Sequence, residues 1–284
     1  MVTNEIAPAA PGRYAPVNGL SMYYEIHGTG RPLVLLHGAL TTIEGSFGRM
    51  LPSLAATRQV IAVEQQAHGR TADIDRPLTY EGMAADTVEL LRHLDIEEAD
   101  VFGYSMGAAI ALDIAVRHPD LVHKLVLASP GYTREGAYPE MYEGEENLKP
   151  EDLAGTPFAE DYARTAPNPD DWPGLIEKVK QLDREFRGWT PEEVRSIRAP
   201  TLVIIGDSDV VRPEHAVEMF RLLGGGVPGD LVGLPASRLA VLPGTTHITI
   251  IDRTDWLLSM IGEFLDAPAP EGGNRTEDDK PHQR

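Results

Sequence analysis

The pentapeptide Gly103-Tyr104-Ser105-Met106-Gly107 is the stretch of this sequence whose residue types best fit a chemical role. It follows the apolar run 100–102 and precedes a stretch of small residues with helical spacing at 106–118. In the order strand, turn, helix, G-x-S-x-G places a serine on a tight turn that tolerates only small residues two positions to either side. The free amides at the start of such a helix point toward an anion beside the serine. We therefore predict that Ser105 is a nucleophile; the alternative is a glycine-rich turn whose serine caps the helix.

A serine hydroxyl is a weak nucleophile at neutral pH and needs a neighbouring base. His247 follows the last predicted strand and precedes the last predicted helix, so we expect its side chain over the carboxyl edge of the sheet, where sites in such folds lie. His37 and His68 also follow predicted strands, but both precede the serine in the chain. We predict that His247 is the base; the alternative is a loop histidine bonded to the backbone.

A carboxylate is needed to orient this histidine, and residues 206–209, Gly-Asp-Ser-Asp, offer two. Asp207, directly after the glycine, suits a turn-stabilising bond to nearby backbone amides. The segment that follows the preceding predicted strand has no acid before Glu135. The residues alone leave the role open between Asp207 and Asp209.

These side chains require a scaffold, and the sequence predicts an α/β fold. Short apolar runs alternate with stretches of helical spacing, as expected of a mostly parallel sheet covered by helices on both faces. The dipeptide Asn18-Gly19 predicts a tight hairpin turn before the first run. The predicted strands are 22–26, 33–36, 60–63, 100–102, 124–127, 202–205 and 239–242, and the predicted helices are 80–94, 106–118, 213–223 and 254–265.

The alternation stops between residues 132 and 198, where prolines, glycines and acids accumulate and Thr190-Pro191-Glu192-Glu193 predicts a capped helix start. Residues 134–171 hold eleven Asp and Glu against three Lys and Arg. We predict a core domain in two parts, 1–131 and 199–266, a helical cap at 132–198 between two strands, and a disordered tail at 267–284.

Composition excludes several classes of protein. The chain of 284 residues has no cysteine, so disulfides and thiol chemistry are excluded. A formal net charge of -19 disfavours nucleic acid and anionic membranes as partners. The N-terminus has no basic segment followed by an apolar one, and no segment approaches the length of a membrane span. We expect a soluble, cytoplasmic protein.

Four motifs together resemble the α/β-hydrolase superfamily over residues 14–265. In chain order they are Leu35-Leu36-His37-Gly38-Ala39, Gly103-Tyr104-Ser105-Met106-Gly107, Gly206-Asp207-Ser208-Asp209 and Pro243-Gly244-Thr245-Thr246-His247. The resemblance implies the α/β-hydrolase fold with a helical cap and the chain order nucleophile, acid, histidine, and it places the acid at Asp209. It also implies an oxyanion hole made by the backbone amides of Ala39 and Met106, with His37 as a positioning residue. A serine at 105 argues against the haloalkane dehalogenase and epoxide hydrolase branches, which use aspartate there.

The segment 64–71 departs from the family, because Glu64 takes the acidic place that is often Asp, and Ala67 replaces a glycine. We interpret this segment as a structural loop closing one wall of the site. The alternative is a substrate contact from Gln65, Gln66 or Arg70.

The predicted reaction is hydrolysis of a small to medium neutral carboxylic ester or lactone through an acyl-enzyme, with no cofactor and no metal. Alternatives on the same triad are carbon-carbon bond hydrolysis, perhydrolysis, and amide cleavage as in proline iminopeptidases. An alternative of another class is a ligand-sensing protein with little turnover. The predicted partner is a small molecule, and the oligomeric state is left open. The candidate pocket residues are Leu40, Tyr104, Tyr132, Trp172 and Trp189.

Overall fold

A single sheet of eight strands organises the computed structural model, which describes residues 12–268. The strand order is β1-β2-β4-β3-β5-β6-β7-β8, and all neighbours from β4 onward run parallel. Each of the predicted strands lies within one of the observed ones, so the predicted α/β sheet is confirmed. The strands are β1 Arg13–Val17, β2 Leu20–His27, β3 Arg31–Leu36, β4 Arg58–Val63, β5 Ala99–Tyr104, β6 Val122–Ala128, β7 Thr201–Ser208 and β8 Arg238–Thr246.

The antiparallel edge of the sheet begins with a hairpin. Asn18 and Gly19 join β1 to β2 with positive φ angles of 46° and 88°, which suits a two-residue turn between twisted strands. The predicted turn is therefore confirmed, although β1 itself was not among the predicted strands. β2 then pairs antiparallel with β4.

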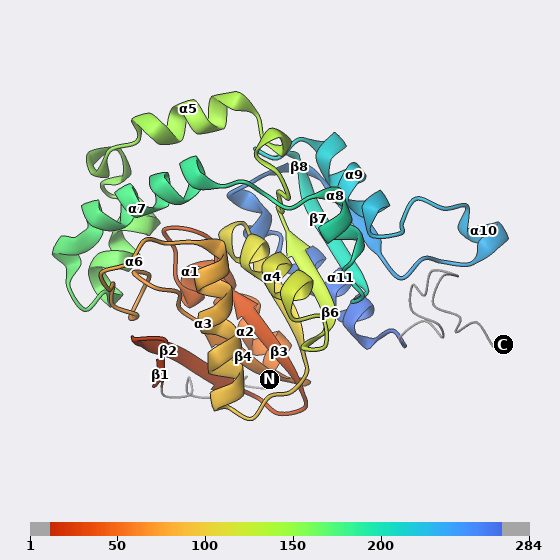
Figure 1. Cartoon of the computed structure of the whole chain (residues 1–284), viewed down its shortest axis with the longest axis horizontal. Helices are drawn as coiled ribbons and strands as arrows, with labels where there is room; N and C mark the ends of the chain where they lie inside the picture. The colour runs from red at the N-terminus through yellow and green to blue at the C-terminus, as the bar shows by residue number, and fades with distance from the viewer. Residues whose placement is uncertain (1–11, 269–284) are drawn as a thin grey trace, which may run out of the picture.

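Helices cover both faces of the sheet, because alternate residues of each buried strand point to opposite sides. In β3, Val34 and Leu36 pack toward α3 and α4, whereas Leu33 and Leu35 pack toward α1, α2 and α11. Figure 1 shows α3 and α4 in front of the sheet. The helices of the core are α1 Ile43–Phe47, α2 Leu51–Ala55, α3 Tyr80–His93, α4 Met106–Arg117, α9 Pro213–Leu222, α10 Gly229–Val232, the 3-10 turn η4 Thr249–Asp252 and α11 Thr254–Asp266. Across residues 12–268, none of the helices has the length and apolar character that crossing a bilayer requires.

Between β6 and β7 the chain forms helices, loops and one isolated bridge from Ala137 to Val211, and the part from α5 to α7 lies beyond the ends of the strands (Figure 1). Lys178 ties this segment to the core by an ion pair of 2.6 Å with Asp73, and Thr190 and Glu193 form the predicted capping box. The domain boundaries remain a prediction, and residues 269–284 of the predicted tail lie outside the described residues. The elements are η1 Arg134–Gly136, α5 Pro139–Asn147, η2 Pro150–Leu153, α6 Pro157–Thr165, η3 Pro169–Asp171, α7 Trp172–Glu185 and α8 Pro191–Arg195.

Two buried histidines hold the loop that follows β3. The His37 ring bonds the Gly38 carbonyl through Nδ1 at 2.7 Å, and its Nε2 accepts the Gln65 amide at 3.0 Å. Since Nε2 is an acceptor, the ring is neutral with its proton on Nδ1. Burial lowers the pKa of His37 to about 3, helped by the neighbouring His68, whose own pKa burial lowers to about 4. The two rings lie 5.1 Å apart.

The loop 64–71 supports the same arrangement. The buried Glu64 carboxylate accepts the backbone amide of Arg70 at 2.5 Å and its guanidinium at 2.7 Å. Gly69 folds tightly over this carboxylate at a φ of 52°. The Glu64 carboxylate is thus bonded to Arg70, and the Gln65 amide to His37. Gln65 Oε1 and His68 Nε2, by contrast, are buried without a hydrogen-bond partner among the described residues. The bonds of Glu64 and Gln65 favour the structural interpretation of this loop.

The neutral histidines predict acid sensitivity. In the unfolded chain both protonate near pH 6.5, but in the fold they stay neutral, so the unfolded state binds more protons and stability falls as pH drops below about 6.5. As the pH falls from 6.5 to the pKa of the folded state, each of these histidines lowers the unfolding free energy by about 1.4 kcal/mol per pH unit. Urea denaturation of wild type and His68→Gln between pH 7.5 and 5 gives the unfolding free energy at each pH. This free energy should fall less steeply with decreasing pH in the variant than in wild type. The exposed His93→Gln is the control, and equal slopes for His68→Gln and wild type would contradict the account.

Candidate active site

Ser105 occupies a tight turn between β5 and α4, with φ 54° and ψ -116°. A Cβ on Gly103 would lie 2.1 Å from the Gly107 carbonyl oxygen, and one on Gly107 would lie 2.0 Å from the Leu36 oxygen. Both positions therefore require glycine. The Ser105 side chain makes no capping bond to α4, which argues against the interpretation of this residue as a helix cap. The backbone conformation costs roughly 1–3 kcal/mol.

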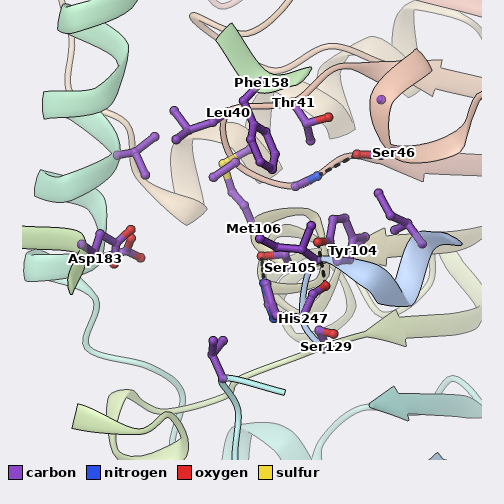
Figure 2. A pocket seen from close by; sticks show the side chains of 18 of the residues that line it. Leu40, Thr41, Ser46, Tyr104, Ser105, Met106, Ser129, Phe158, Asp183 and His247 are labelled. Carbon is purple, nitrogen blue, oxygen red and sulfur yellow. Dashed lines mark hydrogen bonds between the residues drawn. The ribbon is translucent and has the colours of Figure 1, made fainter. Parts of the chain in front are cut away.

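A chain of hydrogen bonds leads from this serine to a buried acid. Ser105 Oγ lies 2.8 Å from His247 Nε2, as Figure 2 shows, and His247 Nδ1 lies 2.7 Å from Asp209 Oδ1. Asp209 also accepts the Ser129 hydroxyl at 2.6 Å on Oδ2 and the Val211 amide at 3.2 Å on Oδ1. The structure thus brings together the three residues predicted as nucleophile, base and acid.

The environment of Asp209 keeps it ionised. Burial alone would raise its pKa, but the bond and charge of His247, followed by the bonds from Ser129 and Val211, bring the pKa below its ordinary value. An ionised carboxylate at Nδ1 fixes the histidine tautomer that leaves Nε2 free to accept a proton.

His247 is itself held at the end of β8. The Tyr104 hydroxyl donates to the His247 carbonyl at 2.9 Å. Tyr104, predicted as a pocket residue, lines the cavity and also positions the histidine.

Asp207 makes a different set of bonds. Its carboxylate accepts the amides of Gly244 at 3.0 Å and Thr245 at 3.2 Å, which hold its pKa below the ordinary value. The predicted bonds to backbone amides exist, but the amides belong to the neighbouring strand β8 and not to the turn of Asp207. Asp207 therefore ties β7 to β8 shortly before His247.

The two predicted oxyanion donors lie beside the serine. Met106 is the first residue of α4, so its amide has no acceptor within the helix. Ala39 follows the Gly38 turn, whose amide contacts Ser46 Oγ at 3.4 Å (Figure 2). Both residues line one cavity with Ser105. Their role as a hole remains a prediction.

The cavity above Ser105 has a volume of about 850 Å³, within the usual range for small-molecule sites. Leu40 lines it as predicted, and Figure 2 shows Leu40 and Phe158 on the side opposite His247. Apolar residues of the cap form much of the wall. They are Met141, Leu148, Phe158, Val179, Leu182 and Phe186. Phe158 is among the cap aromatics that the sequence suggests for an apolar pocket, whereas the others were not singled out; for Val179 and Leu182 the available signal was their helical spacing in α7.

Three predicted pocket residues do not line this cavity, and the prediction for Tyr132, Trp172 and Trp189 is wrong. Tyr132 is buried against His215, with ring centroids 4.3 Å apart. Trp172 packs on Tyr162, and Trp189 donates its indole N–H to Asp113 at 3.2 Å. These rings pack the cap and its attachment to the core instead. Gln65, Gln66 and Arg70 do not line the cavity either.

Within residues 12–268, no group of three or more His, Cys, Asp or Glu side chains is arranged to hold a metal ion.

Replacing each of the two aspartates by asparagine tests their different roles. Asp209→Asn should lower kcat by about 1000- to 10,000-fold because the amide no longer fixes the histidine tautomer, while the fold persists. Asp207→Asn should lower the unfolding midpoint and leave most of kcat. Steady-state kinetics and urea denaturation of both variants measure this, and the reverse pattern would exchange their roles.

Ser129 was missed by the sequence analysis, since a serine after a strand carries no signal of its own. Its hydroxyl donates to the buried oxygen of Asp209 that does not contact the histidine. Loss of a hydrogen bond to a charged group predicts that Ser129→Ala lowers kcat by about tenfold or more with little change in KM. A rise in KM without loss of kcat would instead make Ser129 a substrate contact, since it also lines the cavity.

Comparison with known proteins agrees with this geometry. A sequence model of the "Alpha/beta hydrolase family" matches residues 33–259. BpoC of Mycobacterium tuberculosis, provisionally named a non-heme bromoperoxidase, is 30% identical over 272 residues, covering 87% of this chain and 98% of BpoC. The solved meta-cleavage product hydrolase of Pseudomonas fluorescens IP01 shares the fold with a TM-score of 0.71 at 18% identity, over 91% of this chain and 98% of that one. The enol-lactonase of Burkholderia xenovorans LB400 also shares the fold, with a TM-score of 0.68 at 21% identity, over 89% of this chain and 100% of that one. The chain belongs to the alpha/beta hydrolase family.

Proposed function

We propose that this protein is a serine hydrolase that cleaves a small to medium carboxylic ester or lactone through an acyl-enzyme. The observation that carries the proposal is the unbroken chain of bonds from Ser105 Oγ through His247 to Asp209, at 2.8 and 2.7 Å. This chain of bonds begins at a serine that lines a partly open cavity with a mostly apolar wall. This is the arrangement that makes an alcohol nucleophilic at neutral pH.

In the proposed mechanism, Ser105 attacks the carbonyl carbon while His247 accepts the hydroxyl proton. Asp209 stabilises the imidazolium that forms. The amides of Ala39 and Met106 bind the tetrahedral oxyanion, and His247 returns the proton to the leaving alcohol. Water, deprotonated by His247, then attacks the acyl-enzyme and releases the acid.

The charge around the cavity supports a substrate without negative charge. The lining includes the acids Glu44, Glu145, Asp161, Asp183 and Asp252, against one arginine, Arg49. An anionic substrate would meet a net negative wall.

A second candidate follows from the 30% identity to BpoC, whose name describes a bromoperoxidase. The same acyl-enzyme could be attacked by hydrogen peroxide in place of water, which would release a peracid and regenerate Ser105. Measuring peracid formation from an ester in the presence of hydrogen peroxide, with a peroxide-free sample as control, distinguishes this reaction from simple hydrolysis.

A fluorophosphonate probe tests the proposed nucleophile. The probe should modify Ser105 of the folded protein, and Ser105→Ala should abolish both labelling and cleavage of p-nitrophenyl esters, with kcat reduced by about a millionfold. Peptide mapping by mass spectrometry locates the label. Substrate choice is read from a panel of p-nitrophenyl esters, lactones and aminoacyl amides.

Ser129→Ala is the comparison variant, because it keeps the nucleophile and should still be labelled. Retention of ester cleavage by Ser105→Ala would exclude the proposed mechanism. Fast turnover of amides without ester cleavage would assign a peptidase instead.

A further inference from the structure

A pair of carboxyl groups lies in the same cavity as the serine but outside the proposed chemistry. Glu145 on α5 and Asp183 on α7 lie within hydrogen-bonding reach of each other, and both line the cavity that contains Ser105 and His247. Figure 2 shows the Asp183 side chain directed toward the space beside Ser105. The cap thus presents two acids to whatever occupies the cavity.

This pair differs from the other acids of the cavity wall in having no cationic partner. Glu44 and Asp161 both pair with Arg164, at 2.9 and 2.7 Å, and Asp252 pairs with Arg49 at 2.8 Å. Among the described residues, no Lys, Arg or His side chain lies within 4.0 Å of the carboxyl oxygens of Glu145 or Asp183. The pair therefore differs from the other acids of the wall in lining the cavity without an ion-pair partner in the described part of the chain.

The charge of Arg134 acts on both carboxyl groups and lowers the pKa of each, although Arg134 forms no ion pair with them. The Arg134 guanidinium donates to the backbone carbonyl of Asp183 and lies 3.7 Å from the Tyr142 ring centroid, so its hydrogen bond goes to the backbone and not to a carboxyl group. The Tyr80 hydroxyl lies 3.5 Å from Asp183 Oδ1, a long contact. His247 is near enough for its charge to act on Asp183.

Burial and mutual proximity favour a proton on this pair of carboxyl groups. Burial, followed by the bond to Asp183 and its charge, raises the pKa of Glu145 to about 9, and burial raises the pKa of Asp183. A pair of carboxyl groups that shares one proton carries one negative charge and one O–H donor.

We propose that Glu145 and Asp183 bind a protonated amino group of the substrate, so that the preferred ester or lactone carries an ammonium separated from its carbonyl by an apolar spacer. This inference rests on the proposed function and narrows it. An ammonium supplies both the missing positive charge and several N–H donors. A hydroxyl would leave the charge uncompensated, and a carboxylate would be repelled. The spacer follows from the apolar side chains Val179, Leu182 and Phe186 on the same wall.

The test compares three p-nitrophenyl esters of similar length at pH 7: 6-aminohexanoate, heptanoate and adipate. Wild type should prefer the amino ester over heptanoate by about tenfold to a hundredfold in kcat/KM, the range expected for a charge-assisted hydrogen bond. Most of the preference should appear in KM, and adipate should be the poorest substrate. Equal kcat/KM for the amino ester and heptanoate would overturn the inference.

Variants identify the residues responsible. In Glu145→Gln with Asp183→Asn, the ratio of kcat/KM for the amino ester over heptanoate should fall toward one. Glu143→Gln, the same exchange at an exposed position of α5, should keep the wild-type ratio. A wild-type ratio in the double variant would overturn the assignment of these residues, and circular dichroism establishes that each variant is folded.

The two proposals can fail separately. Cleavage of heptanoate without preference for the amino ester retains the serine hydrolase and rejects the amine site. If no ester is cleaved and Ser105 is not labelled, the proposed hydrolase function is rejected. The proposed amine site is then tested by ligand binding alone. Calorimetry should find hexylammonium bound more tightly than hexanol by wild type but not by the double variant; equal binding by wild type rejects the site.

Discussion

The tight turn at Ser105 is the constraint on which the rest of the site depends. A non-glycine residue at φ 54° and ψ -116° is strained, and the strain persists because β5 and α4 meet on either side of it. Gly103 and Gly107 permit that approach, since a Cβ at either would lie about 2 Å from a backbone oxygen. The turn exposes the hydroxyl at the carboxyl edge of the sheet, at the start of a helix whose first amides are free.

Three other parts of the structure complete the site around this turn: strands β7 and β8, the loop after β3, and the cap. β7 and β8 bring Asp209 and His247 within reach, and Asp207 fastens these two strands together. The loop after β3 is held by the neutral ring of His37, so its backbone stays beside the serine. The cap closes the remaining side with apolar side chains and the pair Glu145 and Asp183. In the proposed mechanism, proton transfer therefore belongs to the core and substrate choice to the cap.

Much of the core could be predicted from sequence because its signals are local. The strands are continuous apolar runs, and the Ser105 turn is marked by glycines that no other residue can replace. The cap could not be predicted in the same way, since its aromatic residues give no sign of direction. Trp172 and Trp189 pack inward, while Phe158 and Phe186 face the cavity. Ser129 and the carboxyl pair escaped notice because their roles come from neighbours 80 and 38 positions away in the chain, as the bond of Ser129 to Asp209 and the pairing of Glu145 with Asp183 show.

The most direct test of the account is detection of the covalent intermediate. Wild-type protein is mixed with excess p-nitrophenyl heptanoate, quenched in acid within milliseconds, digested and analysed by mass spectrometry. The account predicts a heptanoyl group on the peptide that contains Ser105, formed as fast as the burst of p-nitrophenol appears. Steady cleavage of the ester without any acylated Ser105 peptide, or with the acyl group on another residue, would contradict it.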